Sequence, residues 1–196
     1  MALPSWVPEI ETKPAPMPLL LVQSFVNTWE GDTGIDLLED LPTATRWLNE
    51  AGLVAGSFED RDLVEARVLR EAIRALLVRN AHRDAPDNAE RSAVSALALG
   101  SRYRPVVTPG GGIELEPEPG TGSLPATLFL LIRDAQRDGT WARLKACRNP
   151  DCQWAYYDRS HAGRGAWCDM AVCGNRIKNR NLRSRRSAGT SGHPPG

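Results

Sequence analysis

Four cysteines, the only ones in the chain, lie within a stretch of 27 residues. They form two pairs with four residues between the members of each pair, and fifteen residues separate Cys152 from Cys168; the outer members are Cys147 and Cys173. Paired thiols at this spacing are a typical ligand set for one tetrahedral metal ion, and zinc is the metal that four cysteine sulfurs favour. We therefore predict one structural zinc ion, which folds a segment too short to bury a sufficient core by itself.

The cysteines also allow other interpretations. They could be ordinary buried thiols or a redox pair. A catalytic zinc is disfavoured, because four thiolate ligands leave no coordination position for water. Redox sensing, in which oxidation ejects the metal, would add a property to a structural site.

The charges of the chain are divided at the cysteine-rich segment. Residues 1–140 carry 13 basic and 21 acidic side chains, a net charge of −8, whereas residues 141–186 carry 11 basic and 3 acidic side chains, a net charge of +8. Arginine outnumbers lysine 21 to 3; guanidinium groups suit bidentate contacts to phosphate or guanine, although a GC-rich genome produces the same bias. The asymmetry indicates a polyanionic partner for the basic end.

Polar and basic side chains that follow the last cysteine are the candidate nucleic-acid contacts. They are Asn175, Arg176, Lys178, Arg180, Arg183, Arg185 and Arg186. In a helix over residues 174–186, Arg176, Arg180 and Arg183 fall on one face, where like charges repel unless an anionic surface neutralises them. Because Arg and Asn also read guanine and adenine edges, we predict that this helix lies against duplex DNA. The alternatives are a solvated charged face and a nonspecific tail that touches RNA.

The hydrophobic pattern predicts a mainly α-helical body with one β-hairpin. Apolar periodicity, capping residues and glycines predict helices over 19–29, 43–51, 88–99 and 123–139, with the longest helix opening at a capping box over 57–60. Strands are expected over 103–108 and 113–116, joined by a Pro-Gly-Gly-Gly turn.

The predicted organisation has four parts. A disordered leader with five prolines covers residues 1–18. The helical domain with its hairpin, an α+β domain, covers 19–140, a small four-cysteine zinc module covers 141–186, and a disordered tail covers 187–196.

Composition also bears on the compartment. No apolar run reaches the 18 residues that a membrane-spanning helix needs, so no membrane partner is expected. The apolar run over 19–22 is the candidate for a signal peptide, but it follows a proline-rich leader instead of a basic segment and is not read as one. Free thiols without an export signal indicate a reducing cytoplasm, with nucleoid association if the chain binds DNA.

Residues 19–140 assemble no catalytic constellation, and we expect a protein without enzymatic activity. Their one histidine, His82, is expected to face solvent. Asn27 and Trp29 could line a ligand pocket, although a helix-end hydrogen bond and a core aromatic are their more ordinary roles. We expect this acidic domain to sense a small-molecule effector or to form a homodimer, while its charge keeps it off DNA.

Two motifs resemble known families. The run Cys173-Gly-Asn-Arg176, with the preceding cysteine pairs and Trp167, resembles the CGNR zinc-finger family. The run Phe25-Val-Asn-Thr28 resembles the F-V-N-T signature of the ABATE domain, which usually precedes this finger in bacterial stress-induced transcription regulators. The resemblance implies zinc binding and DNA binding, and the runner-up interpretation is an RNA- or ribosome-associated protein with a structural zinc module.

Overall fold

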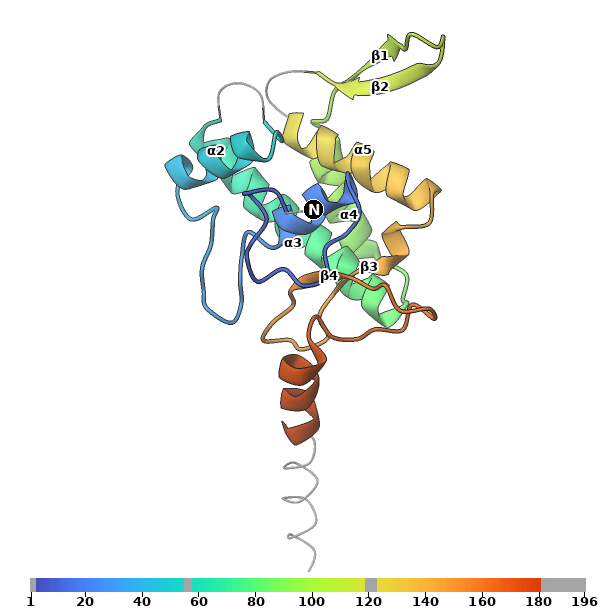
Figure 1. Ribbon diagram of the computed structural model, residues 1–196. Coiled ribbons are helices and arrows are strands. Elements are labelled where there is room, and N and C mark those ends of the chain that lie inside the picture. Colours follow the sequence, from blue (N-terminus) through green and yellow to red (C-terminus); the bar gives the residue numbers. More distant parts are fainter. Residues whose placement is uncertain (1–2, 55–57, 119–122, 181–196) are drawn as a thin grey trace, which may run out of the picture.

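The computed structural model describes residues 3–54, 58–118 and 123–180 of the chain. The helices of the body are α1 (Leu19–Val26), α2 (Leu41–Glu50), α3 (Asp60–His82), α4 (Asn88–Ala98) and α5 (Ser123–Arg137). Two antiparallel hairpins lie at opposite ends of the body (Figure 1): β1 (Tyr103–Val107) with β2 (Ile113–Pro117), and β3 (Leu144–Ala146) with β4 (Ala155–Tyr157). Two short turns of helix, η1 (Trp141–Arg143) and η2 (Met170–Gly174), flank the second hairpin and its loops. The fold is mainly α with small β elements, as predicted.

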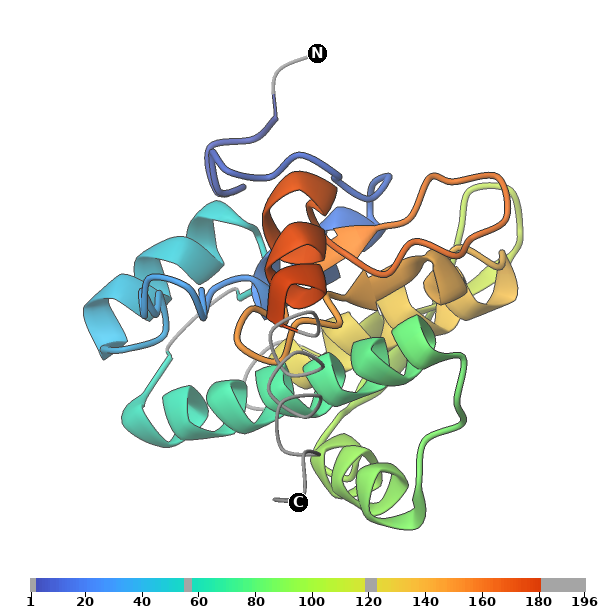
Figure 2. The ribbon, with the colours of Figure 1, turned by 90° about the horizontal axis from the view of Figure 1, so that it is seen from below.

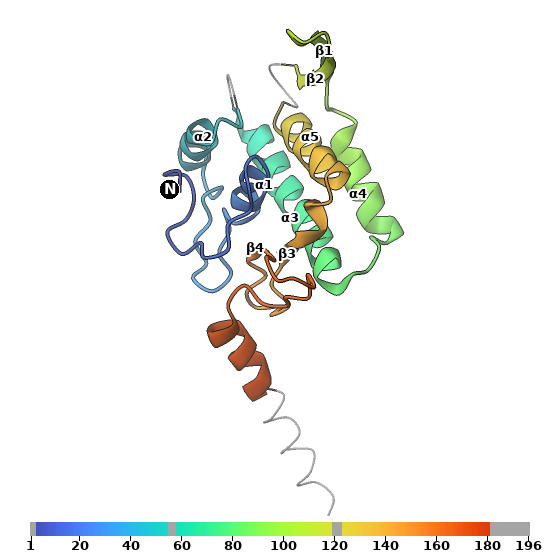
Figure 3. The same cartoon turned by 45° about the vertical axis from the view of Figure 1, so that its right-hand side comes forward.

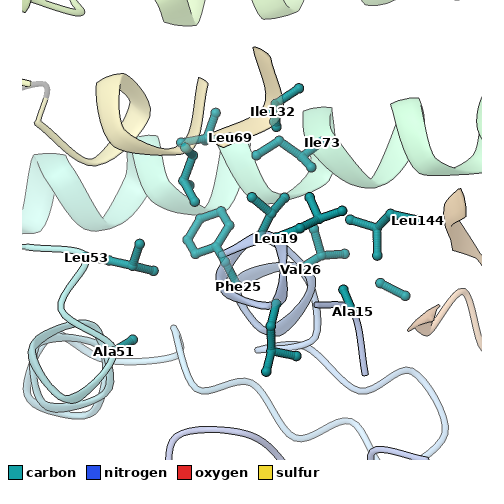
Figure 4. Packing of buried hydrophobic residues seen from close by; sticks show 14 of the residues in the cluster. Ala15, Leu19, Phe25, Val26, Ala51, Leu53, Leu69, Ile73, Ile132 and Leu144 are labelled. Atoms are coloured by element: carbon teal, nitrogen blue, oxygen red, sulfur yellow. The ribbon is translucent and has the colours of Figure 1, made fainter. Parts of the chain in front are cut away.

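The long helix α3 is the centre of the structure, and it packs against α1, α2, α4, α5 and β3 (Figure 3). Its buried stripe includes Leu63, Leu69, Ile73 and Leu77, at the three- and four-residue steps that the sequence shows. Figure 4 shows Leu69 and Ile73 above α1, whose Phe25 is fully buried. Each such side chain contributes about 1.5–3 kcal/mol when it leaves water, so the contact between α1 and α3 is a substantial part of the apolar core.

Two helices begin at other residues than the sequence predicts, because acidic side chains cap their first turns. The N-cap of α3 is Glu59, which forms a reciprocal capping box with Asp62, and the predicted cap at 57 lies outside the described residues. The carboxylate of Asp40 accepts a hydrogen bond from Thr43 N at 2.8 Å, so α2 begins two residues earlier than predicted. His82, at the end of α3, is exposed as expected.

The prediction of a disordered leader is wrong for residues 3–18. Val7 and Ala15 belong to the buried core. The carbonyl of Lys13 accepts a hydrogen bond from Tyr157 N at 2.9 Å, and the carbonyl of Trp6 accepts one from Trp47 Nε1 at 3.0 Å. Prolines lower the entropy that the leader loses on ordering, and the apolar residues between them supply surface to bury. The leader therefore wraps the body and covers the free edge of β4.

The four-cysteine segment shares the core of the helical body. Leu144 and Ala146 of β3 and Ala155 and Tyr157 of β4 are buried in the same apolar cluster as α1 and α3. This second hairpin is absent from the sequence prediction. The predicted tail over 187–196 lies outside the described residues. No helix within the described ranges is long and apolar enough to cross a membrane.

Candidate metal centre and nucleic-acid interface

The loop between β3 and β4 presents the first two cysteines. Cys147 N donates a hydrogen bond to Trp154 O at 2.9 Å, which extends the hairpin by one pair beyond its strands. The amides of Cys152 and Gln153 both donate to Asn149 O at 3.0 Å, which closes a tight turn, and Gln153 has a φ of 49°. Both sulfurs are thereby held on one side of the hairpin tip.

The second pair lies on the turn that leads into the C-terminal helical segment. Asp169 caps this turn: its carboxylate accepts a hydrogen bond from Val172 N at 2.8 Å, and its carbonyl accepts one from Cys173 N at 3.0 Å. Gly174 follows directly, and a Cβ there would lie 2.5 Å from Met170 Sδ and 3.2 Å from Trp167 Cδ1. A side chain at position 174 would therefore have to displace Met170, which packs over the turn.

The structure brings all four predicted ligands together. The four Sγ atoms lie within 4.8 Å of one another, and Cys168 Sγ lies 3.7 Å from the Sγ atoms of both Cys152 and Cys173. A regular tetrahedron with Zn–S distances of about 2.3 Å has sulfur–sulfur edges of about 3.8 Å. Three of the thiols are buried and Cys168 is half-buried. The donor set and its dimensions fit one structural zinc ion without an open coordination position.

The four thiols lie so close together that they lose their protons readily only when a cation is bound between them. Hydrogen bonds to Cys147 and Cys152, together with burial, raise the pKa of the Cys168 thiol. A hydrogen bond to Cys147 is also the main cause that raises the pKa of Cys152 to about 12. Four thiolates at these distances repel one another unless a dication neutralises them, so zinc binding releases protons and protons compete with zinc.

Asn27 joins the metal centre to α1. Its side-chain Nδ2 donates a hydrogen bond to Ala155 O at 2.9 Å, and its Oδ1 accepts one from Ala155 N at 2.8 Å. Gln23 Nε2 also donates to Ala155 O, at 3.2 Å. One buried side chain thus satisfies both backbone groups of a β4 residue, as a neighbouring strand would. The sequence prediction placed Asn27 at a helix end or in a pocket and missed this link.

A buried arginine, Arg74 of α3, makes a second link. Its guanidinium donates to Gln153 O at 2.9 Å and to Val26 O at 2.7 Å, and so ties the first cysteine turn to the end of α1. Its Nε donates to Glu71 Oε2 at 2.9 Å. The guanidinium lies 5.0 Å from the centre of the Trp29 ring, so Trp29 is the stacking partner of this arginine. The link made by Arg74 could have been suspected from the sequence only because this arginine lies beside the apolar stripe of a long helix.

The basic segment leaves the body directly after the metal centre. Residues 175–180 are helical and project away from the body, on the side opposite the β1–β2 hairpin (Figure 1). Viewed from below in Figure 2, they lie in front of the middle of the body. Asn175, Arg176, Lys178 and Arg180 are exposed. The remaining predicted contacts, Arg183, Arg185 and Arg186, lie outside the described residues.

Two of the exposed arginines pair with carboxylates of the protein itself. Arg176 Nη1 lies 2.9 Å from Asp32 Oδ1, and Arg180 Nη1 lies 3.2 Å from Asp151 Oδ2. A Cβ on Gly31 would lie 2.8 Å from Asp151 O, so the turn that carries Asp32 is in direct contact with the backbone of the first cysteine turn. The repulsion that the sequence predicts along this helix is therefore relieved in part by the body, in addition to any polyanion.

The fold and site define a class: a zinc protein in which a four-cysteine centre is built onto a helical domain. Comparison with known families identifies both parts. The model of the CGNR zinc finger matches residues 143–186, and the model of the ABATE family, described as "putative stress-induced transcription regulator", matches residues 20–138. The chain belongs to the ABATE family and ends in a CGNR zinc finger. No curated protein matches the sequence.

Freshly purified, reduced protein is expected to contain one zinc ion per chain by elemental analysis. Cys152→Ser and Cys173→Ser, each of which removes one ligand, should lose the metal. Zinc should also be lost as the pH falls, because protons displace it from the thiolates; the zinc-dependent part of the stability is therefore present at neutral pH and absent in acid. Stoichiometric zinc in both serine variants would contradict this assignment.

Replacing Asn27 by Ala should lower the free energy of unfolding by about 1–3 kcal/mol. Among the described residues, the buried amide of Ala155 would lose the one side chain that accepts its hydrogen bond, and its carbonyl would lose one of two side-chain donors. Urea denaturation followed by circular dichroism measures the change. Asn49→Ala, at an exposed position of α2, is the matched control and should leave stability unchanged. Equal unfolding midpoints for the two variants would contradict the link between α1 and β4.

Proposed function

We propose that this protein is a non-enzymatic, DNA-binding transcription regulator in which the zinc centre aims a basic helix at duplex DNA. The observation that carries the proposal is the position of residues 175–180: they follow the fourth ligand without a linker and project from an acidic body (Figure 1). No acidic residue follows Cys173 to the end of the sequence. The family descriptions, a zinc finger and a transcription regulator, support the same function.

The attachment of the zinc centre gives this helix a defined direction. The turn that precedes it is fixed by the metal ligands, and the metal centre is fixed in turn by Asn27 and Arg74. A finger on a flexible tether would have to lose its orientational freedom on binding, whereas a helix rigidly joined to the body has already lost it. The rest of the body, with its net negative charge, favours contact through the basic end alone.

The ion pairs of Arg176 and Arg180 do not prevent such binding. All four partners are well exposed, and exposed ion pairs contribute about 0–1 kcal/mol each. The phosphate array of DNA releases bound counterions when it is neutralised, which makes it the stronger partner. The pairs with Asp32 and Asp151 therefore weaken DNA binding modestly and hold the helix against the body in its absence.

Removing both exposed arginines tests the interface. The double variant Arg176→Ala/Arg180→Ala should bind a genomic DNA fragment about tenfold more weakly at 0.15 M salt, and the slope of log K against log salt should fall from about −4 or −5 by one to two units. Gel shifts and fluorescence anisotropy measure both quantities. Arg137→Ala on α5 is the control. Each variant must retain one zinc ion per chain. A slope of log K against log salt near zero for the unchanged protein would contradict the proposal.

Structured RNA serves as the competitor in the same experiment. A regulator of transcription should prefer duplex DNA, while a ribosome-associated protein should prefer the RNA. Addition of a chelator should abolish the DNA shift, because the helix loses the turn that aims it.

Neutralising the acidic partners should have the opposite effect. Asp32→Asn/Asp151→Asn should increase DNA affinity about three- to tenfold, since the two arginines then lose their competing carboxylates and the surface near DNA loses two negative charges. Asp60→Asn/Asp84→Asn, at exposed positions of the body that are distant in sequence, provides a control for net charge. Equal gains in both double variants would show a general charge effect and would contradict specific competition.

A further inference from the structure

A cavity of about 310 Å³ opens where the leader folds back over the body. Its walls come from the leader, the end of α1, the loop between α1 and α2, α2 itself, and the residue just before β4. The ordered leader forms one side of it through Trp6, Val7 and Ile10. Its volume is at the lower end of the range for small-molecule sites.

Three tryptophans are among the residues that line the cavity. Trp6, Trp47 and Trp154 all contribute to it. The indole nitrogens of Trp47 and Trp154 are already engaged, with Trp6 O at 3.0 Å and Glu11 Oε2 at 3.1 Å. The side chains of Trp47 and Trp154 therefore offer the cavity apolar ring surface and not hydrogen-bond donors. Ile10 and Ile35, about half exposed, add apolar surface at its mouth.

The charged groups of the cavity all have the same sign. Glu9, Glu30 and Glu50 line it, and neither Lys nor Arg does. Within the described ranges none of these three carboxylates forms an ion pair; the one hydrogen bond from a side chain to them comes from Thr33 Oγ1 to Glu30, at 2.8 Å. Unpaired carboxylates around aromatic rings attract a cation and repel an anion.

The buried polar groups at the floor of the cavity also disfavour an anionic ligand, because their donors already have acceptors within the protein. Thr28 Oγ1 donates its proton to Phe25 O at 2.8 Å, and Asn27 Nδ2 is directed to Ala155 O. Both buried donors are therefore committed to the fold. A carboxylate or phosphate group that entered would lose its hydration without replacement.

We propose that this cavity binds an organic cation, a protonated or quaternary amine attached to an aromatic or branched apolar group. Aromatic rings with nearby carboxylates are a common way of binding such cations. Trp154 is two residues from the ligand Cys152, so an occupant contacts the wall that the cavity shares with the metal centre. An effector role for this cation rests on the regulator function proposed above, whereas the binding itself does not.

Calorimetric titration of the full-length zinc protein with benzyltrimethylammonium, without DNA, tests the site. This cation should bind about tenfold or more tightly than neutral benzyl alcohol, which has a similar aromatic body, and phenylacetate should not bind. Glu9→Gln/Glu50→Gln should weaken cation binding about tenfold, since it removes two of three carboxylates while keeping side-chain size. Glu65→Gln/Glu114→Gln, at exposed positions elsewhere, should leave it unchanged.

A second variant tests the location without changing charge. Ile35→Trp places a larger side chain at the mouth of the cavity and should reduce binding of the same cation about tenfold or more, with zinc content unchanged. Equal affinity for cation and alcohol, or equal loss in the two glutamine double variants, would overturn the proposal. Cation binding with no DNA binding would overturn only the regulator function, and DNA binding without cation binding would overturn only this site.

Discussion

The mutual repulsion of four sulfur atoms held within 4.8 Å is the constraint on which this structure depends. Such a cluster is stable as thiolates only around a dication, and structural zinc in short segments supplies about 10–16 kcal/mol of apparent binding free energy. The hairpin β3–β4 contributes just three residues per strand, far too little to be stable alone. Metal binding at its tip and burial against α1 and α3 together make it a fixed part of the fold.

The zinc centre is continuous with the helical body. Asn27 binds β4 as a strand would, and Arg74 joins the first cysteine turn to α1. These contacts are buried, so they are stronger than the exposed ion pairs that hold the basic helix. Asn27 and Arg74 are thus two direct contacts between the end of α1 and the hairpin that carries the first cysteine pair.

The leader has a similar role farther along the same free edge of β4. It covers the free edge of that strand through Lys13, and it forms one wall of the aromatic cavity through Trp6. The cavity consequently borders both the metal centre and the F-V-N-T run. Asn27 of this run connects the end of α1 to β4, the strand that follows the first cysteine pair more than a hundred residues later.

Local patterns in the sequence determined the ligands of the metal, the buried stripe of α3, the main helices, the first hairpin and the exposed basic residues near the end. Spacing, periodicity and turn residues act over a few neighbours, and they can be read without a fold. Only the tertiary structure decided that the leader is ordered, that three-residue strands form beside the metal, and that Asn27, Arg74 and Asp32 act on segments far away in the chain. Those outcomes depend on which buried amides and charges meet across the core, and no local pattern contains that information.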